Sequence, residues 1–272
     1  MSNRQKTLSR FDAERYWSQR LEETYSLAGV GWLGLGEEFN RWMYAVRRRV
    51  FLREVRGRLD PSRARVLDVG SGTGFYVERW QELGVRDITG VDLTSVAVER
   101  LRGRFPELVF EQLDITEALP NLPPFDAISA MDVLFHIVDD DAYARAFENI
   151  AALLAPGGIF VLTENLLHRK TDRSEHQASR SMEEVCDLLR QAGLTIELRS
   201  PLFVLMNTPV DSDSAFLRRA WTVVNLLVRR GPRYAWTVGA LLYPFERALT
   251  RILREGPSTE IIVCRKSAAA AH

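Results

Sequence analysis

The sequence predicts an α/β fold, in which an open, twisted and mostly parallel sheet is flanked by helices. From residue 65 onward, short apolar runs alternate with helical stretches, the pattern that parallel strands with crossover helices produce. A turn with three glycines, at residues 70–74, joins the first apolar run to a helix. Asp92 and Asp114 stand where the next two runs end. Ligands of such sheets bind at the carboxyl ends of the strands, so we expect the site there.

The first 60 residues precede the sheet and are rich in aromatic side chains. Apolar residues between Phe39 and Val50 fall on one face at helical spacing, and we expect the arginines at 47–49 on the exposed side. This predicts an amphipathic helix, which either docks on the core or forms a lid over the site. The glycine-rich residues 29–36 predict a flexible loop. We therefore treat residues 1–60 as an N-terminal helical lid segment.

Strands and helices then alternate along the predicted sheet domain, residues 61–208 and 258–267. The predicted strands are 65–69, 87–91, 108–113, 127–130 and 159–163, separated by helices at 75–83, 95–104 and 142–154. The sequence Pro156-Gly157-Gly158 ends the last of these helices. Ser181 and Glu184 form a capping box that begins a further helix. The remaining elements are that helix, at 181–192, and strands at 195–205 and 259–265.

Residues 209–257 form an insertion between the last two strands that closing the sheet does not require. Leu217 and Trp221 share a helical face, and Pro244 with Glu246 predicts the start of a second helix. The insertion is therefore predicted to be helical, as a solvated structural cap or as a functional surface.

The turn after the first strand gives the strongest indication of function. It follows the apolar run Val-Leu-Asp-Val, and its glycines Gly70, Gly72 and Gly74 let peptide N–H groups approach a ligand at the positive end of the next helix. A dinucleotide fingerprint would have glycine where Phe75 stands, so a nicotinamide cofactor is disfavoured. Asp68 would repel a diphosphate but suits a ligand that carries an ammonium group.

The sequence Leu-Asp-x-Gly-x-Gly-x-Gly, together with Ala-Pro-Gly-Gly at residues 155–158, resembles class I S-adenosylmethionine-dependent methyltransferases of the small-molecule and glycan O-methyltransferase type. The resemblance covers residues 65–163 most firmly. It implies a Rossmann-like sheet of seven strands with an antiparallel last strand. It also implies S-adenosylmethionine as cofactor and S-adenosylhomocysteine as product. In that family, insertions such as residues 209–257 shape the acceptor pocket or a dimer contact.

Cofactor contacts follow from position and from the resemblance. Asp92 comes 22 positions after Gly70, and a carboxylate there can accept hydrogen bonds from both ribose hydroxyls. The resemblance implies that Asp114 accepts a hydrogen bond from the adenine amino group, and that nearby apolar side chains hold the ring and the methionine portion. A cap or turn is the alternative role for these aspartates. The predicted cofactor contacts are Asp68, Gly70, Gly72, Gly74, Asp92, Leu93, Asp114, Ile115 and Met131.

His136 and Glu164 are the predicted catalytic residues. His136 follows the fourth strand, where the methyl group of the cofactor should point out of its pocket, and a neutral imidazole can accept a proton. In some O-methyltransferases that the chain resembles, a histidine here is the general base and a carboxylate after the fifth strand assists, the place of Glu164. A structural role is the alternative for His136. The acids at 139–141 are interpreted as N-cap and dipole partners, so no metal is predicted.

The composition limits the partners. Basic and acidic residues balance at 36 each, so no overall field attracts the chain to nucleic acid. Two cysteines and a polar start predict a cytoplasmic protein without a signal peptide. The longest nearly apolar run, residues 234–245, is too short to span a bilayer, which leaves peripheral membrane contact and a homodimer open.

We therefore predict an enzyme, an S-adenosylmethionine-dependent methyltransferase that methylates an oxygen. A sugar or glycan hydroxyl ranks first as acceptor, and an aromatic or polyketide hydroxyl ranks second. The alternatives of another class are a non-catalytic cofactor-binding partner of another enzyme and a lipid-surface binder that works through the insertion.

Overall fold

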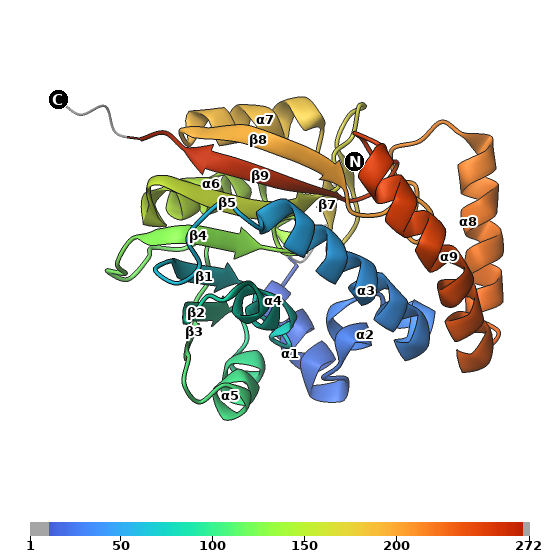
Figure 1. The fold of residues 1–272 in the computed structure, drawn as a ribbon, viewed down its shortest axis with the longest axis horizontal. Helices are drawn as coiled ribbons and strands as arrows, with labels where there is room; N and C mark the ends of the chain where they lie inside the picture. The colour runs from blue at the N-terminus through green and yellow to red at the C-terminus, as the bar shows by residue number, and fades with distance from the viewer. Residues whose placement is uncertain (1–10, 269–272) are drawn as a thin grey trace, which may run out of the picture.

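A computed structural model describes residues 11–268 and has the predicted α/β architecture (Figure 1). Its main sheet has seven strands in the order β3-β2-β1-β4-β5-β9-β8. Neighbouring strands from β3 to β5 pair in parallel, and β9 is antiparallel to both β5 and β8. The prediction of a mostly parallel sheet with an antiparallel last strand is confirmed. The strands are β1 (Arg65–Val69), β2 (Asp87–Asp92), β3 (Val109–Gln112), β4 (Phe125–Ala130), β5 (Leu154–Glu164), β8 (Leu194–Pro201) and β9 (Glu260–Lys266).

Helices cover both faces of the sheet because successive strand residues point to opposite faces. Val66 packs in one apolar cluster with α3, α4 and α5, and its neighbour Leu67 packs in another with α6 and α7. The first layer consists of α3 (Gly36–Val55), α4 (Phe75–Leu83) and α5 (Ser95–Arg104), and the second of α6 (Asp140–Leu153) and α7 (Met182–Gln191). Ser181 caps α7 by accepting the N–H of Glu184 at 3.2 Å, as the capping box predicts.

The N-terminal segment folds against the carboxyl ends of the strands as a series of helices. These are α1 (Ala13–Glu23), α2 (Leu27–Val30), the 3-10 turn η1 (Leu33–Leu35) and α3. The prediction of a flexible loop at residues 29–36 is wrong, because side chains from neighbouring helices fix this backbone. Arg20 donates to the carbonyls of Gly29 and Gly31 at 2.6 and 2.5 Å, and Asn40 donates to the carbonyl of Trp32 at 2.8 Å. Residues 1–10 of the predicted lid segment lie outside the described residues.

The insertion consists of two helices, α8 (Ala215–Val228) and α9 (Pro232–Ile252). The prediction that Pro244 begins the second helix is wrong, since Pro232 opens α9 and Pro244 lies inside it. Glu246 does not serve a helix start either. Its buried carboxylate accepts the N–H groups of Val204 and Leu205, both at 2.7 Å. Because these N–H groups bond to Glu246, they do not continue the β-sheet hydrogen bonds of β8. The strand therefore ends at Pro201 and not at residue 205 as predicted.

The insertion is joined to the sheet domain where α9 crosses α3 at very close range (Figure 1). A Cβ atom at Gly239 would lie 2.3 Å from Cδ1 of Trp42, which is too close for any side chain. The indole ring of Trp42 also contacts Trp236 and Tyr243, with ring centroids 5.9 and 5.3 Å apart. Glycine is therefore required at this crossing by packing and not by backbone conformation.

We expect Gly239→Val to destabilise the fold by about 1–3 kcal/mol, the usual effect of overpacking, because Trp42 would have to move. Ala248→Val is the matched control, since it places the same β-branched side chain at an exposed position of α9. Urea unfolding of both variants measures the difference. Equal free energies of unfolding would show that α3 and α9 are not in close contact.

Candidate functional site

A cavity of about 160 Å³ opens at the carboxyl ends of β1, β2 and β4. The turn after β1, the ends of β2 and β3, and the segment after β4 form its walls, and α1 and α3 cover it. Most residues predicted to contact a ligand meet here, although they come from separate strands. The predicted residues that line the cavity are Gly70, Gly72, Asp92, Leu93, Asp114, Ile115, Met131 and His136.

The three glycines of the turn all have positive φ, but they serve different contacts. At Gly72, with φ +53°, a Cβ atom would lie 3.1 Å from Val30, whose side chain also lines the cavity. A Cβ atom at Gly70 would meet Val133 at 2.3 Å. Gly74 lies outside the cavity lining, and a Cβ atom there would meet Phe105 at 2.6 Å. Gly70 and Gly72 thus bring backbone to the cavity wall, whereas Gly74 permits packing of α4 on α5.

Asp92 holds the turn in place from the end of β2. Its Oδ2 accepts the N–H of Gly72 at 2.8 Å, and its Oδ1 accepts the N–H and the hydroxyl of Thr94, each at 2.9 Å. Burial raises the pKa of Asp92, and these hydrogen bonds act in the opposite direction. The carboxylate also lines the cavity, so its remaining lone pairs are placed to accept from a bound molecule.

Asp68 lies behind the turn and not in the cavity lining. Its Oδ1 accepts the hydroxyl of Ser129 at 2.5 Å, and Ser129 in turn accepts the indole N–H of Trp80 at 2.9 Å. Burial raises the pKa of Asp68 to about 7. In this structure Asp68 therefore links β1 to β4 beneath the turn, and its contact with a ligand ammonium group stays a prediction for a side chain that does not line the cavity.

Asp114 and its apolar neighbours form the far end of the cavity. Oδ1 of Asp114 accepts the N–H and hydroxyl of Thr116 at 2.8 and 2.7 Å. Leu93 follows β2 and Ile115 follows β3, and both line the cavity. Met131, directly after β4, is buried on the opposite side of the turn. This end of the cavity thus combines apolar side chains with one carboxylate.

A second cavity, of about 590 Å³, adjoins the first. The two share wall residues from the N-terminal helices and from the segment after β4, which are Trp17, Val30, Tyr44, Asp132 and His136. Aromatic rings and amide side chains alternate around the rest of the second cavity. Among them are Tyr16, Trp32, Asn40, Asn165, Asn207 and Gln177.

His136 stands on the wall between the two cavities in one defined tautomer. Its Nδ1 lies 2.9 Å from the backbone carbonyl of His176. Because a carbonyl only accepts, Nδ1 carries the proton and Nε2 is left as an acceptor. The rings of Trp17 and Phe135 pack on the imidazole, with centroids 4.9 and 4.6 Å away. Burial lowers the pKa of His136 to about 4, so the ring is neutral at neutral pH.

The structure does not bring Glu164 to His136, and the predicted pairing of these two residues is not formed. Glu164 ends β5 on the same face as Phe160 and Leu162, which is the face covered by α6. Its Oε1 accepts the hydroxyl of Tyr143 at 2.9 Å, and burial raises its pKa to about 8. The alternation of the strand, which is visible in the sequence, already indicates this face.

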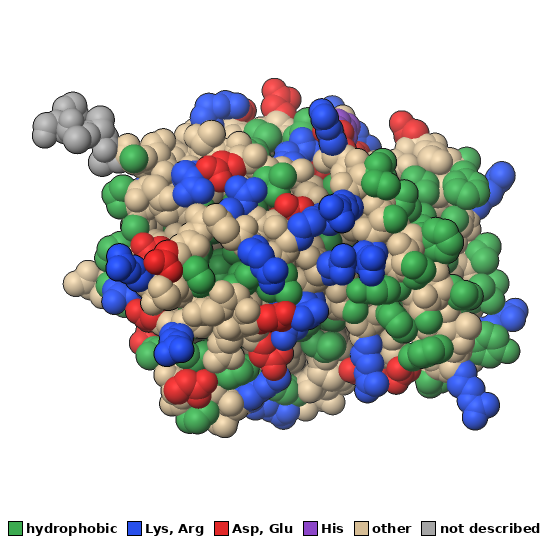
Figure 2. All heavy atoms as spheres, in the orientation of Figure 1, with side chains coloured by type: hydrophobic (Ala, Val, Ile, Leu, Met, Phe, Trp, Pro, Cys, Tyr) green, Lys and Arg blue, Asp and Glu red, His purple; other side chains and the backbone are tan. Residues whose placement is uncertain are grey.

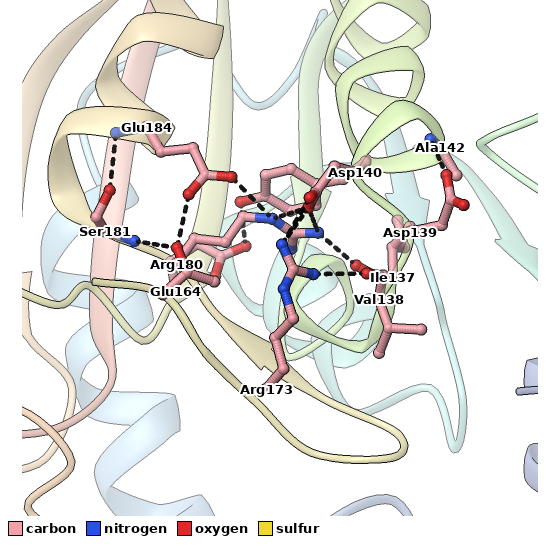
Figure 3. A network of polar contacts seen from close by, with 12 residues as sticks. Ile137, Val138, Asp139, Asp140, Ala142, Glu164, Arg173, Arg180, Ser181 and Glu184 are labelled. Atoms are coloured by element: carbon pink, nitrogen blue, oxygen red, sulfur yellow. Dashed lines mark hydrogen bonds and ion pairs between the residues drawn. The ribbon is translucent and has the colours of Figure 1, made fainter. Parts of the chain in front are cut away.

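Glu164 belongs instead to a polar network that fixes the segment after His136 (Figure 3). Arg180 is fully buried, lies 3.5 Å from the centroid of the Tyr143 ring, and donates to Asp140 and to the carbonyl of Ile137, both at 2.9 Å. Arg173 donates to the same aspartate and to the carbonyl of Val138 at 2.7 Å. The network ties the hairpin of β6 (Asp172–Arg173) and β7 (Ala178–Ser179) to η2 (Leu134–His136).

Two of the three consecutive aspartates take structural roles, and the third, Asp141, lies in the first turn of α6. Asp139 caps α6 by accepting the N–H of Ala142 at 2.9 Å, and Asp140 pairs with the two arginines of the network. Within residues 11–268, no group of three or more histidine, cysteine or acidic side chains is arranged to hold a metal ion.

Sequence reasoning missed Asp132 and misplaced Arg47. Asp132 has φ +61°, rare for a residue other than glycine, and its N–H bonds to the hydroxyl of Thr163 at 2.7 Å. Nε and Nη2 of Arg47 both donate to Oδ2 of Asp132, at 3.0 and 2.9 Å. The predicted exposed arginine face is thus wrong at Arg47, which is buried. In the sequence, only the position of Asp132 between the predicted site residues Met131 and His136 indicated that it lies at the site.

Comparison with known proteins assigns the chain to a family. A family profile described as a methyltransferase domain matches residues 39–199, more than half of the chain. The chain therefore belongs to the family of class I S-adenosylmethionine-dependent methyltransferases.

Two relatives illustrate the range of that family. A malonyl-[acyl-carrier protein] O-methyltransferase of Chlorobium luteolum is 31% identical over 177 residues, which cover 58% of this chain and 66% of that protein. A ubiquinone biosynthesis O-methyltransferase of Xanthomonas axonopodis is 36% identical over 122 residues, which cover 43% of this chain and 49% of that protein. The chain spans less than two thirds of the length of these relatives.

Solved structures share the fold at low identity. A structure described as a sarcosine dimethylglycine methyltransferase of Galdieria sulphuraria has a TM-score of 0.54 at 16% identity and covers 93% of this chain and 98% of its own. The N-methyltransferase NodS of Bradyrhizobium japonicum, in complex with S-adenosylhomocysteine, has a TM-score of 0.53 at 17% identity, with 92% and 98% covered. The [4+2]-cyclase SpnF also has a TM-score of 0.53, at 23% identity, with 83% and 82% covered. These likenesses show the fold alone.

The residues that line the first cavity suit S-adenosylmethionine, the cofactor of the family. At Gly72 the backbone reaches the cavity wall at a point where a side chain would fill the space beside Val30. Asp92 and Asp114 supply acceptors at the ends of adjacent strands, and the slot between Leu93 and Ile115 is apolar, as a purine ring requires.

We expect Glu164→Gln to change how stability depends on pH. Burial raises the pKa of Glu164 to about 8 in the folded protein, whereas an unfolded glutamate titrates near ~4.3. The wild type therefore loses stability as the pH rises from about 4 to about 8, and a neutral glutamine that still accepts from Tyr143 does not. Urea unfolding should show similar stability at about pH 5 and a more stable variant at about pH 9.

Glu148→Gln, at an exposed position of α6, is the control for this measurement. It should follow the wild type at every pH. If Glu164→Gln were less stable than the wild type throughout, Glu164 would be ionised and its charge would be balanced by Arg180.

Proposed function

We propose that the chain is an O-methyltransferase in which His136 removes the proton from an acceptor hydroxyl group. The single observation that supports this best is the hydrogen bond from Nδ1 of His136 to the carbonyl of His176, at 2.9 Å. It leaves Nε2 as a proton acceptor on a side chain that lines both cavities. A general base needs this tautomer and this position.

In this proposal the first cavity binds the cofactor. Asp92 accepts hydrogen bonds from the ribose hydroxyls, and Asp114 accepts from the adenine amino group. Leu93 and Ile115 hold the adenine ring, and Met131 lines the methionine portion. Gly70 and Gly72 contribute backbone, whereas Asp68 and Gly74 act indirectly by supporting the turn.

When bound, S-adenosylmethionine supplies an electrophilic methyl group on a sulfonium. The residues of the chain then have two tasks. The walls of the second cavity hold the acceptor in line, which lowers the entropy that must be lost on the way to the transition state. His136 takes the hydroxyl proton at Nε2, and the resulting charge is stabilised by the carbonyl of His176 at Nδ1 and by the nearby carboxylate of Asp132.

A sugar or glycan hydroxyl is our first choice of acceptor. Rings such as Trp32 and Tyr16 can stack on the apolar face of a sugar, and amides such as Gln177 and Asn207 can bond to its hydroxyls. An aromatic hydroxyl is the second choice, because the relatives include O-methyltransferases of ubiquinone biosynthesis. The alternative of a non-catalytic partner predicts cofactor binding without turnover on any acceptor.

We expect Asp92→Asn to weaken S-adenosylmethionine binding by about 1.5–3 kcal/mol. The neutral amide has one acceptor oxygen without a full charge, whereas the carboxylate can accept from both the N–H of Gly72 and a ribose hydroxyl. Isothermal titration measures the dissociation constant. Asp87→Asn, at the exposed other end of β2, is the control and should bind as the wild type does. An unchanged dissociation constant in Asp92→Asn would remove the ribose assignment.

We expect His136→Ala to lose about 10²- to 10⁴-fold in turnover with nearly unchanged cofactor affinity, the usual effect of removing a positioned base. The control is His168→Ala, because His168 is exposed and pairs with Asp211 outside both cavities. Turnover on a panel of sugar and phenol acceptors and titration of the cofactor are measured on the same variants.

The pH profile adds a second test of His136. Only the neutral ring accepts a proton, and burial lowers its pKa to about 4. The wild-type rate should therefore stay level from neutral pH down to about pH 5 and fall only below that. Wild-type turnover in His136→Ala would show that the acceptor needs no base.

A further inference from the structure

Exposed apolar side chains are concentrated on the two helices of the insertion. Of the eleven large hydrophobic side chains that are exposed within residues 11–268, nine belong to α8, α9 and the residue after α9. Figure 2 shows green side chains covering this end of the molecule, with blue side chains around them. The nine are Phe216, Val223, Leu226, Tyr234, Trp236, Leu241, Phe245, Ile252 and Leu253.

On α9 these side chains form a straight stripe. Tyr234, Leu241, Phe245 and Ile252 are separated by 7, 4 and 7 residues, so they fall on one face of a helix with 3.6 residues per turn. At a rise of ~1.5 Å per residue, the stripe is about 27 Å long. Their exposed fractions range from 51% to 73%, so the stripe faces outward along the whole helix.

The segment that contains these two helices is strongly basic. Residues 215–254 contain eight arginines and one acid, Glu246, although the whole chain is neutral. All eight arginines are exposed, whereas Glu246 is buried and bonded to backbone N–H groups. The arginines are Arg218, Arg219, Arg229, Arg230, Arg233, Arg247, Arg251 and Arg254.

We propose that the surface formed by α8 and α9 binds to an anionic phospholipid bilayer, with the helices lying in the plane of the interface. A helix that combines a long apolar face with many arginines is typical of interfacial binding, in which the apolar face enters the acyl boundary and the cations meet the headgroups. Arginine stems can lie along the apolar layer while their guanidinium groups stay in water. No helix within residues 11–268 has the length and apolar character to cross a bilayer, so the surface lies on the membrane.

Charge favours a bilayer over a second copy of the chain. A symmetric contact through this face would place the eight arginines of residues 215–254 against the same eight of the second copy, and the exposed acids Asp213 and Glu255 lie just outside the segment, one at each end. An anionic bilayer supplies both the negative charge and the apolar layer. An exposed apolar surface of this kind indicates a partner, and the arginines specify its charge.

The surface is independent of the two cavities, since no residue of α8 or α9 lines either of them. It is nevertheless next to the larger one. Trp221 of α8 packs against Trp32, which lines the second cavity, with ring centroids 5.6 Å apart. Membrane binding through this surface would therefore place the entrance of the second cavity near the lipid without changing the residues that hold the cofactor.

Sedimentation with vesicles tests the proposal without measuring methyl transfer. The full chain is mixed with vesicles of phosphatidylcholine alone, or of phosphatidylcholine with phosphatidylglycerol. We expect binding to the vesicles with phosphatidylglycerol, at least tenfold weaker binding to the neutral ones, and a loss of affinity when salt is added.

Two pairs of variants separate the apolar and the charged contributions. Leu241→Ser with Phe245→Ser removes the centre of the stripe, and Arg247→Gln with Arg251→Gln removes two charges; each pair should weaken binding at least tenfold. The controls are Val109→Ser and Arg63→Gln, which are exposed positions outside the insertion and should bind as the wild type does. Circular dichroism and unfolding curves confirm that every variant is folded.

Three results would overturn the proposal. The first is no binding to vesicles that contain phosphatidylglycerol, and the second is equal binding by the variants and the controls. The third is a dimer in analytical ultracentrifugation that Leu241→Ser with Phe245→Ser abolishes, without vesicle binding by the wild type. That result would assign the surface to self-association.

Discussion

The geometry of the site depends on the carboxylate of Asp92. One buried acid holds the N–H of Gly72 with one oxygen and Thr94 with the other, and Thr94 is the N-cap of α5. The turn after β1, the end of β2 and the start of α5 are thereby fixed to each other. A charged acceptor is stronger than a neutral one in such a buried place, and both of its oxygens are used. These bonds hold the floor of the first cavity in place.

Arginines fix the rest of the site by bonding to backbone carbonyls, to carboxylates or to both. Arg20 holds the residues before η1, Arg47 holds Asp132 in its strained conformation, and Arg180 holds the segment after His136. The planar guanidinium group can bond to several acceptors at fixed angles, which an ammonium group cannot do as well. Local helices joined by long-range polar contacts therefore cover both cavities. The same contacts fix the position of His136.

Two surfaces of this chain face different kinds of partner. In our proposal the cavities at the carboxyl ends of the strands bind the cofactor and the acceptor, and aromatic rings such as Trp17 and Trp32 line them. The insertion turns apolar side chains outward and leaves the cavities untouched. The close crossing of α3 and α9 at Gly239 connects the two, because α3 both covers the cavities and supports the insertion. A single helix thus links the methyltransferase domain to the surface that we assign to the bilayer.

The sequence by itself determined the strands of the main sheet with the helices between them, the glycine turn, and the acids at the ends of β2 and β3. These features follow from local periodicity and from spacing along the chain, which short-range geometry dictates. The tertiary structure decided the partners of the buried polar groups. Glu164 bonds to Tyr143 instead of His136, Arg47 bonds to Asp132 across 85 positions, and Glu246 caps a turn about 40 positions away. Such contacts join segments that meet only after the sheet has formed, and a buried charge takes whichever partner then lies within reach.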